Sequence, residues 1–200
     1  MKVSFYFSLL LIFTQTLNAS YYDDVRLGDP EYGGTGCPAG SAAVALSPDA
    51  QSLSILFDSF VVQAGGDFDS VGRKNCNLAV PVHVPAGYSV SIFQIDYRGF
   101  NYLPIGASSR FSVEYFFAGT RGPVYNKTFN GYLNENYLIG NSLVGSAISW
   151  SECGDSVTLR ANTSMMVNNR NRQESAMSTV DSVDIDAGIY FRLNWRPCSN

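Results

Sequence analysis

The clearest pattern along this chain is a strict alternation of apolar and polar residues close to its C-terminus. Apolar side chains take every second position over residues 183–195, with polar or small residues between them. A period of two predicts a β-strand with one buried face and one solvated face, because successive side chains of a strand point to opposite sides. Phe191 is expected on the buried face and Asn194 on the solvated face.

Shorter runs of the same kind recur along the chain. The other segments predicted as strands are 53–62, 78–84, 89–97, 111–117, 147–153 and 157–161. Within 89–97, the pattern places Ser91, Phe93, Ile95 and Tyr97 on one face. Residues 167–178, which are rich in Asn, Arg and Gln, are expected to form a long loop. No segment shows a long helical period, so we expect one all-β domain, an antiparallel β-sandwich with a jelly-roll-like arrangement.

Residues 1–19 have the features of a secretory signal peptide. Lys2 precedes an apolar run over residues 3–13, and a short polar stretch ends at Ala19, which is small enough to precede a cleavage site. The apolar run is shorter than the roughly 20 residues that a membrane-spanning helix needs. The domain is therefore expected to comprise residues 20–200, without a membrane span, and to work in the extracellular space, in a periplasm or at the cell surface.

The charge balance of the exported chain is mildly acidic. Removing Lys2 leaves 12 of the 13 Lys and Arg residues against 17 Asp and Glu, so the net charge is 12 − 17 = −5. The basic residues are dispersed rather than clustered. This composition argues against nucleic acid and against an anionic membrane as partners, and it leaves the oligomeric state open.

Four widely separated cysteines indicate two disulfides: Cys37, Cys76, Cys153 and Cys198. An even number is typical of disulfides in an exported chain, and the absence of a C-x-x-C pair argues against zinc. Three connectivities can be drawn, of which we favour Cys37–Cys76 and Cys153–Cys198. Local pairing supports this choice, and so does the spacing W-x-x-C, which occurs at both Trp150 and Trp195 and suits two neighbouring strand ends. Each bridge would close a loop long enough to stabilise the fold by about 3–4 kcal/mol.

A glycine-rich segment, GGTGCPAGS at 33–41, raises a different possibility. Gly34, Gly36 and Ala39 fit the spacing G-x-G-x-x-A of a dinucleotide-binding loop. Such a loop needs a buried strand before it and a helix after it. The preceding residues are Asp-Pro-Glu-Tyr, and Pro38 and Gly40 would interrupt a helix. We therefore interpret the glycines as a tight turn that lets the neighbouring cysteine reach its partner.

Several short motifs occur in order along nearly the whole exported chain. They are Gly34-Thr35-Gly36-Cys37-Pro38, Phe57, Arg73-Lys74-Asn75-Cys76, Pro85-Ala86-Gly87-Tyr88, Tyr97-Arg98-Gly99-Phe100, Trp150-Ser151-Glu152-Cys153-Gly154 and Leu193-Asn194-Trp195-Arg196-Pro197-Cys198. In this combination the chain resembles a family of secreted fungal and bacterial proteins described as domain of unknown function 4360. The resemblance implies a small extracellular all-β domain. It implies no catalytic residues, because no activity is assigned to that family.

Residues suited to catalysis are scarce. His83 is the single histidine and lies on the polar side of segment 78–84, so a Ser–His–Asp triad or a histidine metal site lacks supporting residues. Asp96, Glu114, Glu135 and Glu152 are available as carboxylates. A secreted glycan-active hydrolase that uses two of them is therefore the alternative function, although no pattern shows which two would face each other.

Two polar motifs suggest further chemistry. Asp67 and Asp69, in the segment GGDFDS at 65–70, offer oxygens that could hold calcium. The segment lacks the full EF-hand pattern, and a solvated acidic loop is the plainer interpretation. No other cofactor is expected. The triplets that begin at Asn126 and Asn162 are N-glycosylation sequons, which matter only in a host that glycosylates exported proteins.

Aromatic residues are the remaining resource for binding. Tyr97, Arg98, Phe100 and Tyr102 lie close together where strand 89–97 is expected to end. Exposed rings form flat apolar platforms on which sugar rings can stack, whereas packing into the core is the competing interpretation. We predict a non-catalytic extracellular or envelope-associated module that binds a glycan-like polymer or cell-surface ligand. Tyr102, beyond Gly99, is the candidate for an exposed stacking ring.

Overall fold

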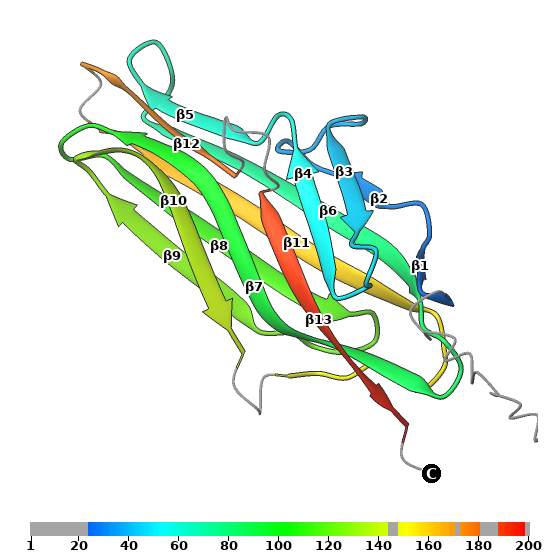
Figure 1. Ribbon diagram of the computed structural model, residues 1–200. Coiled ribbons are helices and arrows are strands. Elements are labelled where there is room, and N and C mark those ends of the chain that lie inside the picture. The colour runs from blue at the N-terminus through cyan, green and yellow to red at the C-terminus, as the bar shows by residue number, and fades with distance from the viewer. Residues whose placement is uncertain (1–23, 144–147, 171–172, 181–187, 199–200) are drawn as a thin grey trace, which may run out of the picture.

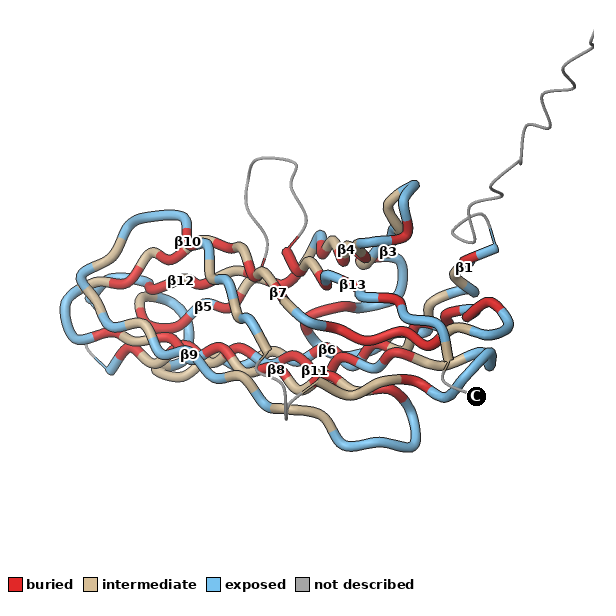
Figure 2. The backbone as a smooth tube through the Cα atoms, turned by 60° about the horizontal axis from the view of Figure 1, so that its bottom comes forward, coloured by how far each residue is buried: buried red, intermediate tan, exposed pale blue. Residues whose placement is uncertain are grey.

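The computed structural model describes residues 24–143, 148–170, 173–180 and 188–198 (Figure 1). Two antiparallel β-sheets pack face to face, with the buried residues between them (Figure 2). The predicted all-β sandwich is confirmed, and these residues include no α-helix. Consequently, the part of the chain that the structure describes holds no helix able to span a membrane. The expected signal peptide, 1–19, lies outside the described residues.

Sheet A forms the layer at the back of Figure 1. Its strands follow the order β1-β6-β11-β8-β9, and β2 also pairs with β6. The bounds are β1 Arg26–Leu27, β2 Glu31–Gly33, β6 Val71–His83, β8 Ser108–Phe117, β9 Val124–Asn130 and β11 Val157–Asn168.

Sheet B forms the front layer. Its strands follow the order β3-β4-β13-β7-β12-β5, and β10 also pairs with β7. The bounds are β3 Ala42–Leu46, β4 Ser52–Phe57, β5 Val61–Gly65, β7 Tyr88–Leu103, β10 Leu133–Ser142, β12 Ser175–Thr179 and β13 Ile189–Pro197. The long strand β7 contacts β13 and β12 along one edge and β10 along the other.

Strand β13 confirms the alternation that the sequence predicts for its described part. Ile189, Phe191, Leu193 and Trp195 are buried, whereas Asn194 is exposed. Phe191 packs edge-on against Tyr115 of β8, with 6.1 Å between the ring centroids, so this contact joins the two sheets. The earlier part of the predicted alternation, 183–187, lies outside the described residues.

Strand β7 departs from the predicted alternation at Phe93. Ile92 and Ile95 are both buried, although three positions separate them, and Phe93 is 37% exposed. The register with β13 shifts between Arg192 and Leu193, which marks a β-bulge at this point. The extra residue of a bulge reverses which face each later side chain occupies. The expectation that Phe93 shares the face of Ile95 is therefore wrong.

Three other predicted segments differ from the structure. The predicted strand 53–62 is two strands, β4 and β5, because the turn-forming residues Asp58 and Ser59 separate them. The predicted loop 167–178 is shorter than expected, since β11 continues to Asn168 and β12 begins at Ser175. In segment 147–153, the described residues contain a single bridge, between Trp150 and Ser91, rather than a strand.

Both predicted disulfides are present, Cys37–Cys76 and Cys153–Cys198, with Cα–Cα distances of 5.4 and 6.0 Å. The two W-x-x-C segments lie beside the start of β7, where Trp195 is in register with Val90 and Trp150 with Ser91. The second bridge therefore fastens two segments that flank the same strand. This arrangement agrees with the interpretation of the repeated spacing as neighbouring strand ends.

The glycine-rich segment is a turn packed beside the first disulfide. Gly34 has φ 145°, and a Cβ there would overlap the Asn75 carbonyl. A Cβ on Gly36 would lie 2.7 Å from the Phe60 ring, and the Gly36 N–H donates to the Asn75 carbonyl at 2.8 Å. The glycines thus allow the chain to approach β6 closely where Cys37 meets Cys76. No helix follows them, so the dinucleotide-loop interpretation is excluded.

Candidate ligand-binding site

The predicted aromatic cluster divides between the core and the outer face of sheet B. Tyr97 points into the core and has 0% exposure. Its ring stacks on Tyr125 of β9 with 5.2 Å between centroids and meets Phe111 of β8 edge-on at 5.0 Å. Burial raises the pKa of the Tyr97 hydroxyl well above its usual range. Tyr97 is therefore a core residue with no surface that a ligand could reach. Alternation along the strand explains this, since Tyr97 points to the face opposite that of the other three members of the cluster.

Arg98, Phe100 and Tyr102 share the outer face of sheet B and are all half-buried. The Arg98 guanidinium lies 5.2 Å from the centre of the Tyr190 ring of β13. Tyr102 lies in register between Asn134 of β10 and Met177 of β12. The sequence-predicted cluster thus places three of its four side chains on one surface.

The expectation that the strand ends at Tyr97, before Gly99, is wrong. Strand β7 continues to Leu103. A Cβ at Gly99 would overlap the Tyr137 hydroxyl and the Thr179 carbonyl, which are hydrogen-bonded to each other at 2.7 Å. Gly99 thus makes room for a contact across β7 rather than ending it, and Tyr102 lies within the sheet.

The most exposed ring on this side of the molecule is one that the sequence analysis missed. Tyr132 is 77% exposed, and Ile105 is 78% exposed. Together with Pro104, Gln173 and Glu174, they line a hollow of about 260 Å³, which we call the loop-end hollow. The available signal was Asn130-Gly131, a dipeptide typical of hairpins, which places the next residue at a turn.

Three connections converge to form the loop-end hollow. Pro104 and Ile105 lie between β7 and β8, Tyr132 lies between β9 and β10, and Gln173 and Glu174 precede β12. These turns gather at the end of the sandwich on the left of Figure 2, opposite the C-terminus. Because Leu133 is in register with Leu103, Tyr132 and Pro104 are neighbours at the end of the outer face that carries Tyr102.

The composition of the loop-end hollow suits a ligand that is apolar on one side and rich in hydroxyls. The exposed ring of Tyr132 and the side chain of Ile105 offer apolar contact. The Gln173 amide can donate and accept hydrogen bonds, and the Glu174 carboxylate can accept them. A few polar groups beside apolar surface fix the orientation of a small ligand.

The positions of the four candidate carboxylates rule out two of the pairings that a hydrolase could use. Asp96, on the outer face of sheet B, lies 3.3 Å from Arg192, whereas Glu114, on the outer face of sheet A, accepts from Asn162 at 3.3 Å. Glu135 lies opposite Asn101 of β7. Glu152 follows Ser151, whose N–H donates to the Val90 carbonyl near the other end of β7. Val90 and Asn101 are about 36 Å apart along this strand. Neither Asp96 with Glu114 nor Glu135 with Glu152 can flank one glycosidic bond.

The candidate calcium ligands lie in the hairpin between β5 and β6. Asp67 and Asp69 are both exposed there. Across the described ranges, no group of three or more His, Cys, Asp or Glu side chains is arranged to hold a metal ion. Calcium binding by this pair stays a prediction. His83 is exposed, with its Nδ1 3.3 Å from the Ser156 hydroxyl.

Comparison with known proteins gives three findings. A family model described as Domain of unknown function (DUF4360) matches residues 23–198. An uncharacterized secreted protein of Arthroderma benhamiae is 32% identical over 185 residues, which are 92% of this chain and 76% of that protein. Among solved structures, the module TmCBM61 in complex with β-1,4-galactotriose aligns over 90% of this chain and 92% of its own, with 10% identity and a TM-score of 0.30. A likeness that weak carries no argument about the ligand.

Proposed function

This chain belongs to the DUF4360 family, and we propose that it is a non-catalytic extracellular domain that binds a glycan at the loop-end hollow. The predicted family resemblance is thereby confirmed. An extracellular site of action is supported by the secreted relative and by the two disulfides. The proposed ligand and its mode of binding are based on the side chains at the outer face of sheet B and its loop end.

The observation that carries this proposal is the exposure of Tyr132. Large aromatic side chains are usually buried in a folded protein, whereas the Tyr132 ring is 77% exposed. Here it stands beside the equally exposed Ile105 and two polar side chains, at the rim of a hollow. This combination of an aromatic platform with hydrogen-bonding groups is suited to a sugar ring, which offers both an apolar face and hydroxyls.

The outer face of sheet B extends the site beyond one sugar unit. Tyr102 and Phe100 precede Pro104 at every second position and point to the same side of β7. Successive outward positions of a strand lie about 6.6 Å apart. A glycan chain that begins at Tyr132 can therefore continue over Tyr102 and Phe100, with Arg98 and Tyr190 farther along.

The test is a screen of purified mature protein against an array of cell-wall and surface glycans, followed by titration of each glycan that binds. Tyr132→Ala is expected to weaken binding about tenfold or more, the effect of losing a central aromatic contact. Tyr102→Ala is expected to weaken it less, because that ring is half-buried. Phe93→Ala is the matched control, since Phe93 is an exposed ring at the bulge, away from the hollow.

Two outcomes would contradict the proposal. If Tyr132→Ala binds every recovered glycan as tightly as the unaltered protein, the loop-end hollow is not the site. If the protein releases reducing sugar from a bound polymer and Glu174→Gln abolishes the release, the domain is a hydrolase rather than a binding module. Thermal unfolding of each variant checks that the fold is intact.

A further inference from the structure

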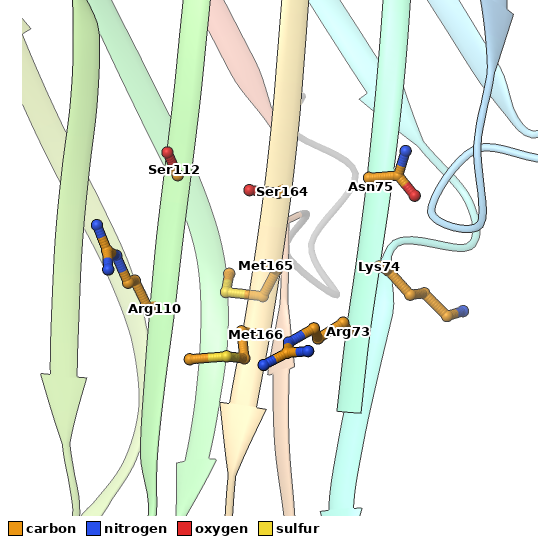
Figure 3. Close-up of a pocket in the computed structure, with 8 residues that line it drawn as sticks. All are labelled: Arg73, Lys74, Asn75, Arg110, Ser112, Ser164, Met165 and Met166. Carbon is orange, nitrogen blue, oxygen red and sulfur yellow. The ribbon is translucent and has the colours of Figure 1, made fainter. Parts of the chain in front are cut away.

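The outer face of sheet A carries a hollow of about 460 Å³ near its middle strands (Figure 3). Strands β6, β11 and β8 provide its lining, which includes two guanidinium groups, two hydroxyls, an amide and a thioether. The residues that provide these groups are Arg73, Arg110, Ser112, Ser164, Asn75 and Met166. This hollow lies on the face of sheet A, whereas the loop-end hollow lies among the turns at one end of the sandwich.

Strand register explains why the sheet is hollowed at this place. Met166 is in register with both Arg73 and Arg110, so three long side chains form one row across the sheet. Ser164 is in register with Asn75 and Ser112, so the next outward row is short. Outward rows lie about 6.6 Å apart along the strands. The short row therefore becomes a floor beside a wall of long side chains.

The hollow is locally positive on an acidic protein. Neither Arg73 nor Arg110 forms an ion pair with another described residue. Arg110 donates from Nη2 to the amide oxygen of Asn126 at 3.1 Å, which is a neutral partner. Glu114, the acidic residue one outward row beyond Ser112, accepts a hydrogen bond from Asn162. The positive charge of both arginines is thus left for an external anion.

The side chains lie in positions that a single ligand could contact. In Figure 3, the Arg73 side chain extends toward Met166, and Arg110 lies on the other side of Met166. Both serine residues lie on the same side of that row. A guanidinium binds carboxylate or sulfate oxygens through parallel N–H donors, and hydroxyls bind other hydroxyls. A thioether gives apolar contact without demanding a fixed shape.

From this geometry we propose a second binding site, independent of the loop-end hollow, for a sugar unit that bears a carboxylate or sulfate group. Arg73 and Arg110 bind the anionic group. Ser112, Ser164 and Asn75 bind sugar hydroxyls, and Met166 contacts the apolar face of the ring. Because the exported chain carries a net charge of −5, counted as 12 Lys and Arg against 17 Asp and Glu, its overall field repels polyanions. Binding therefore depends on this local charge.

The experiment measures binding of three polymers to the full mature domain at low and moderate salt. Polygalacturonate presents carboxylates, dextran sulfate presents sulfates, and dextran is neutral. We expect binding to at least one of the two acidic polymers, weakening as salt rises, and none to dextran. Protein secreted to a bacterial periplasm suits the measurement, because disulfides form there and the sequon at Asn126, beside the hollow, stays unmodified.

The matched variants change one charge at a time. Arg73→Gln and Arg110→Gln are each expected to weaken binding about tenfold or more, as for the loss of a charged hydrogen bond. Arg160→Gln is the control. Arg160 is exposed on β11, the strand that carries Ser164 and Met166, and it lies four residues, or about 13 Å, from Ser164. Its removal changes the net charge equally but leaves the hollow intact. Tyr132→Ala is expected to leave this binding unchanged.

Three results would overturn the proposal. An equal loss in Arg160→Gln would show general charge attraction rather than a site. Unchanged binding in both Arg73→Gln and Arg110→Gln would place the contact elsewhere. An absence of binding to both acidic polymers at low salt would remove the anionic ligand altogether. None of these results bears on the loop-end hollow, where the titration with Tyr132→Ala decides separately.

Discussion

The two outer faces of the sandwich differ in chemistry although the same alternation builds both. The outer face of sheet B carries exposed apolar side chains, Tyr132 at its loop end and Leu138 opposite Arg98. The outer face of sheet A carries guanidinium, amide and hydroxyl groups, and the acceptor residues of both sequons. At the two candidate sites, charged and hydrogen-bonding groups therefore dominate on sheet A and apolar groups on sheet B, although sheet B also carries the Asp96–Arg192 ion pair.

This difference shows where the fold constrains the sequence. Inward positions of both sheets meet the same requirement, since their side chains must fill one closely packed core. Outward positions are free of that requirement, so their chemistry reflects what each face contacts. The two candidate sites are consequently recognised by residues that the fold itself does not require.

The largest expected effect comes from breaking the contrast between the two sides of a single strand. Phe191→Ala removes a fully buried ring that contacts Tyr115 across the sandwich, and it should destabilise the domain by about 3–5 kcal/mol. Asn194→Ala, on the outer side of the same strand, should cost about 0.5 kcal/mol or less. Denaturant titration of both variants measures the difference. Equal shifts in the unfolding midpoint would show that the faces of β13 are misassigned.

Periodicity and spacing predicted the parts of this fold that depend on neighbouring residues. Alternation alone identified the buried side chains of β13, because a strand repeats its environment every second residue. The repeated W-x-x-C spacing favoured Cys153–Cys198, since equal spacing suits two strand ends that flank a common strand. In the same way, the glycines of segment 33–41 were identified as a turn beside Cys37.

Features that depend on register between distant strands could not be predicted. The bulge at Phe93 follows from the pairing of β7 with β13, and it reverses the faces of every later residue of β7. The row that contains Arg73 and Arg110 exists only because β11 places Met166 between them. Tyr132 was missed because a single aromatic residue in a turn has no periodicity. These placements arise from tertiary pairing and not from local pattern.

A smaller effect is expected at alkaline pH, and it separates core tyrosines from surface ones. Burial raises the pKa of Tyr115 to about 12. The unfolded chain loses this proton near pH 10 and the folded chain near pH 12, so the unfolded state binds fewer protons between these values and stability falls as pH rises. At about pH 11 the loss should reach about 1 kcal/mol for this one group.

The control for this effect is Tyr115→Phe. The Tyr115 hydroxyl is buried without a hydrogen-bond partner among the described residues, so its removal should cost little at neutral pH. At about pH 11 the variant should be the more stable protein, because it has no proton to lose at this position. Parallel loss of stability with pH in both proteins would mean that Tyr115 ionises alike in the folded and unfolded states.

The smallest effect on stability is expected from removing the sequons. These substitutions also test directly whether the two outer faces bind ligands independently. Asn126 of β9 is in register with Ser112, and Asn162 of β11 with Glu114, so both acceptors lie on the outer face of sheet A. In protein secreted from yeast, glycopeptide mass spectrometry should find N-glycans at both positions. Asn126→Gln and Asn162→Gln should each remove one glycan and change the free energy of unfolding by about 0.5 kcal/mol or less.

Because a glycan on Asn126 stands beside Ser112, it should hinder binding of acidic polymers at the sheet A hollow while leaving the Tyr132-dependent binding on sheet B unchanged. Weaker Tyr132-dependent binding in the glycosylated protein than in Asn126→Gln would show instead that the two outer faces are not independent.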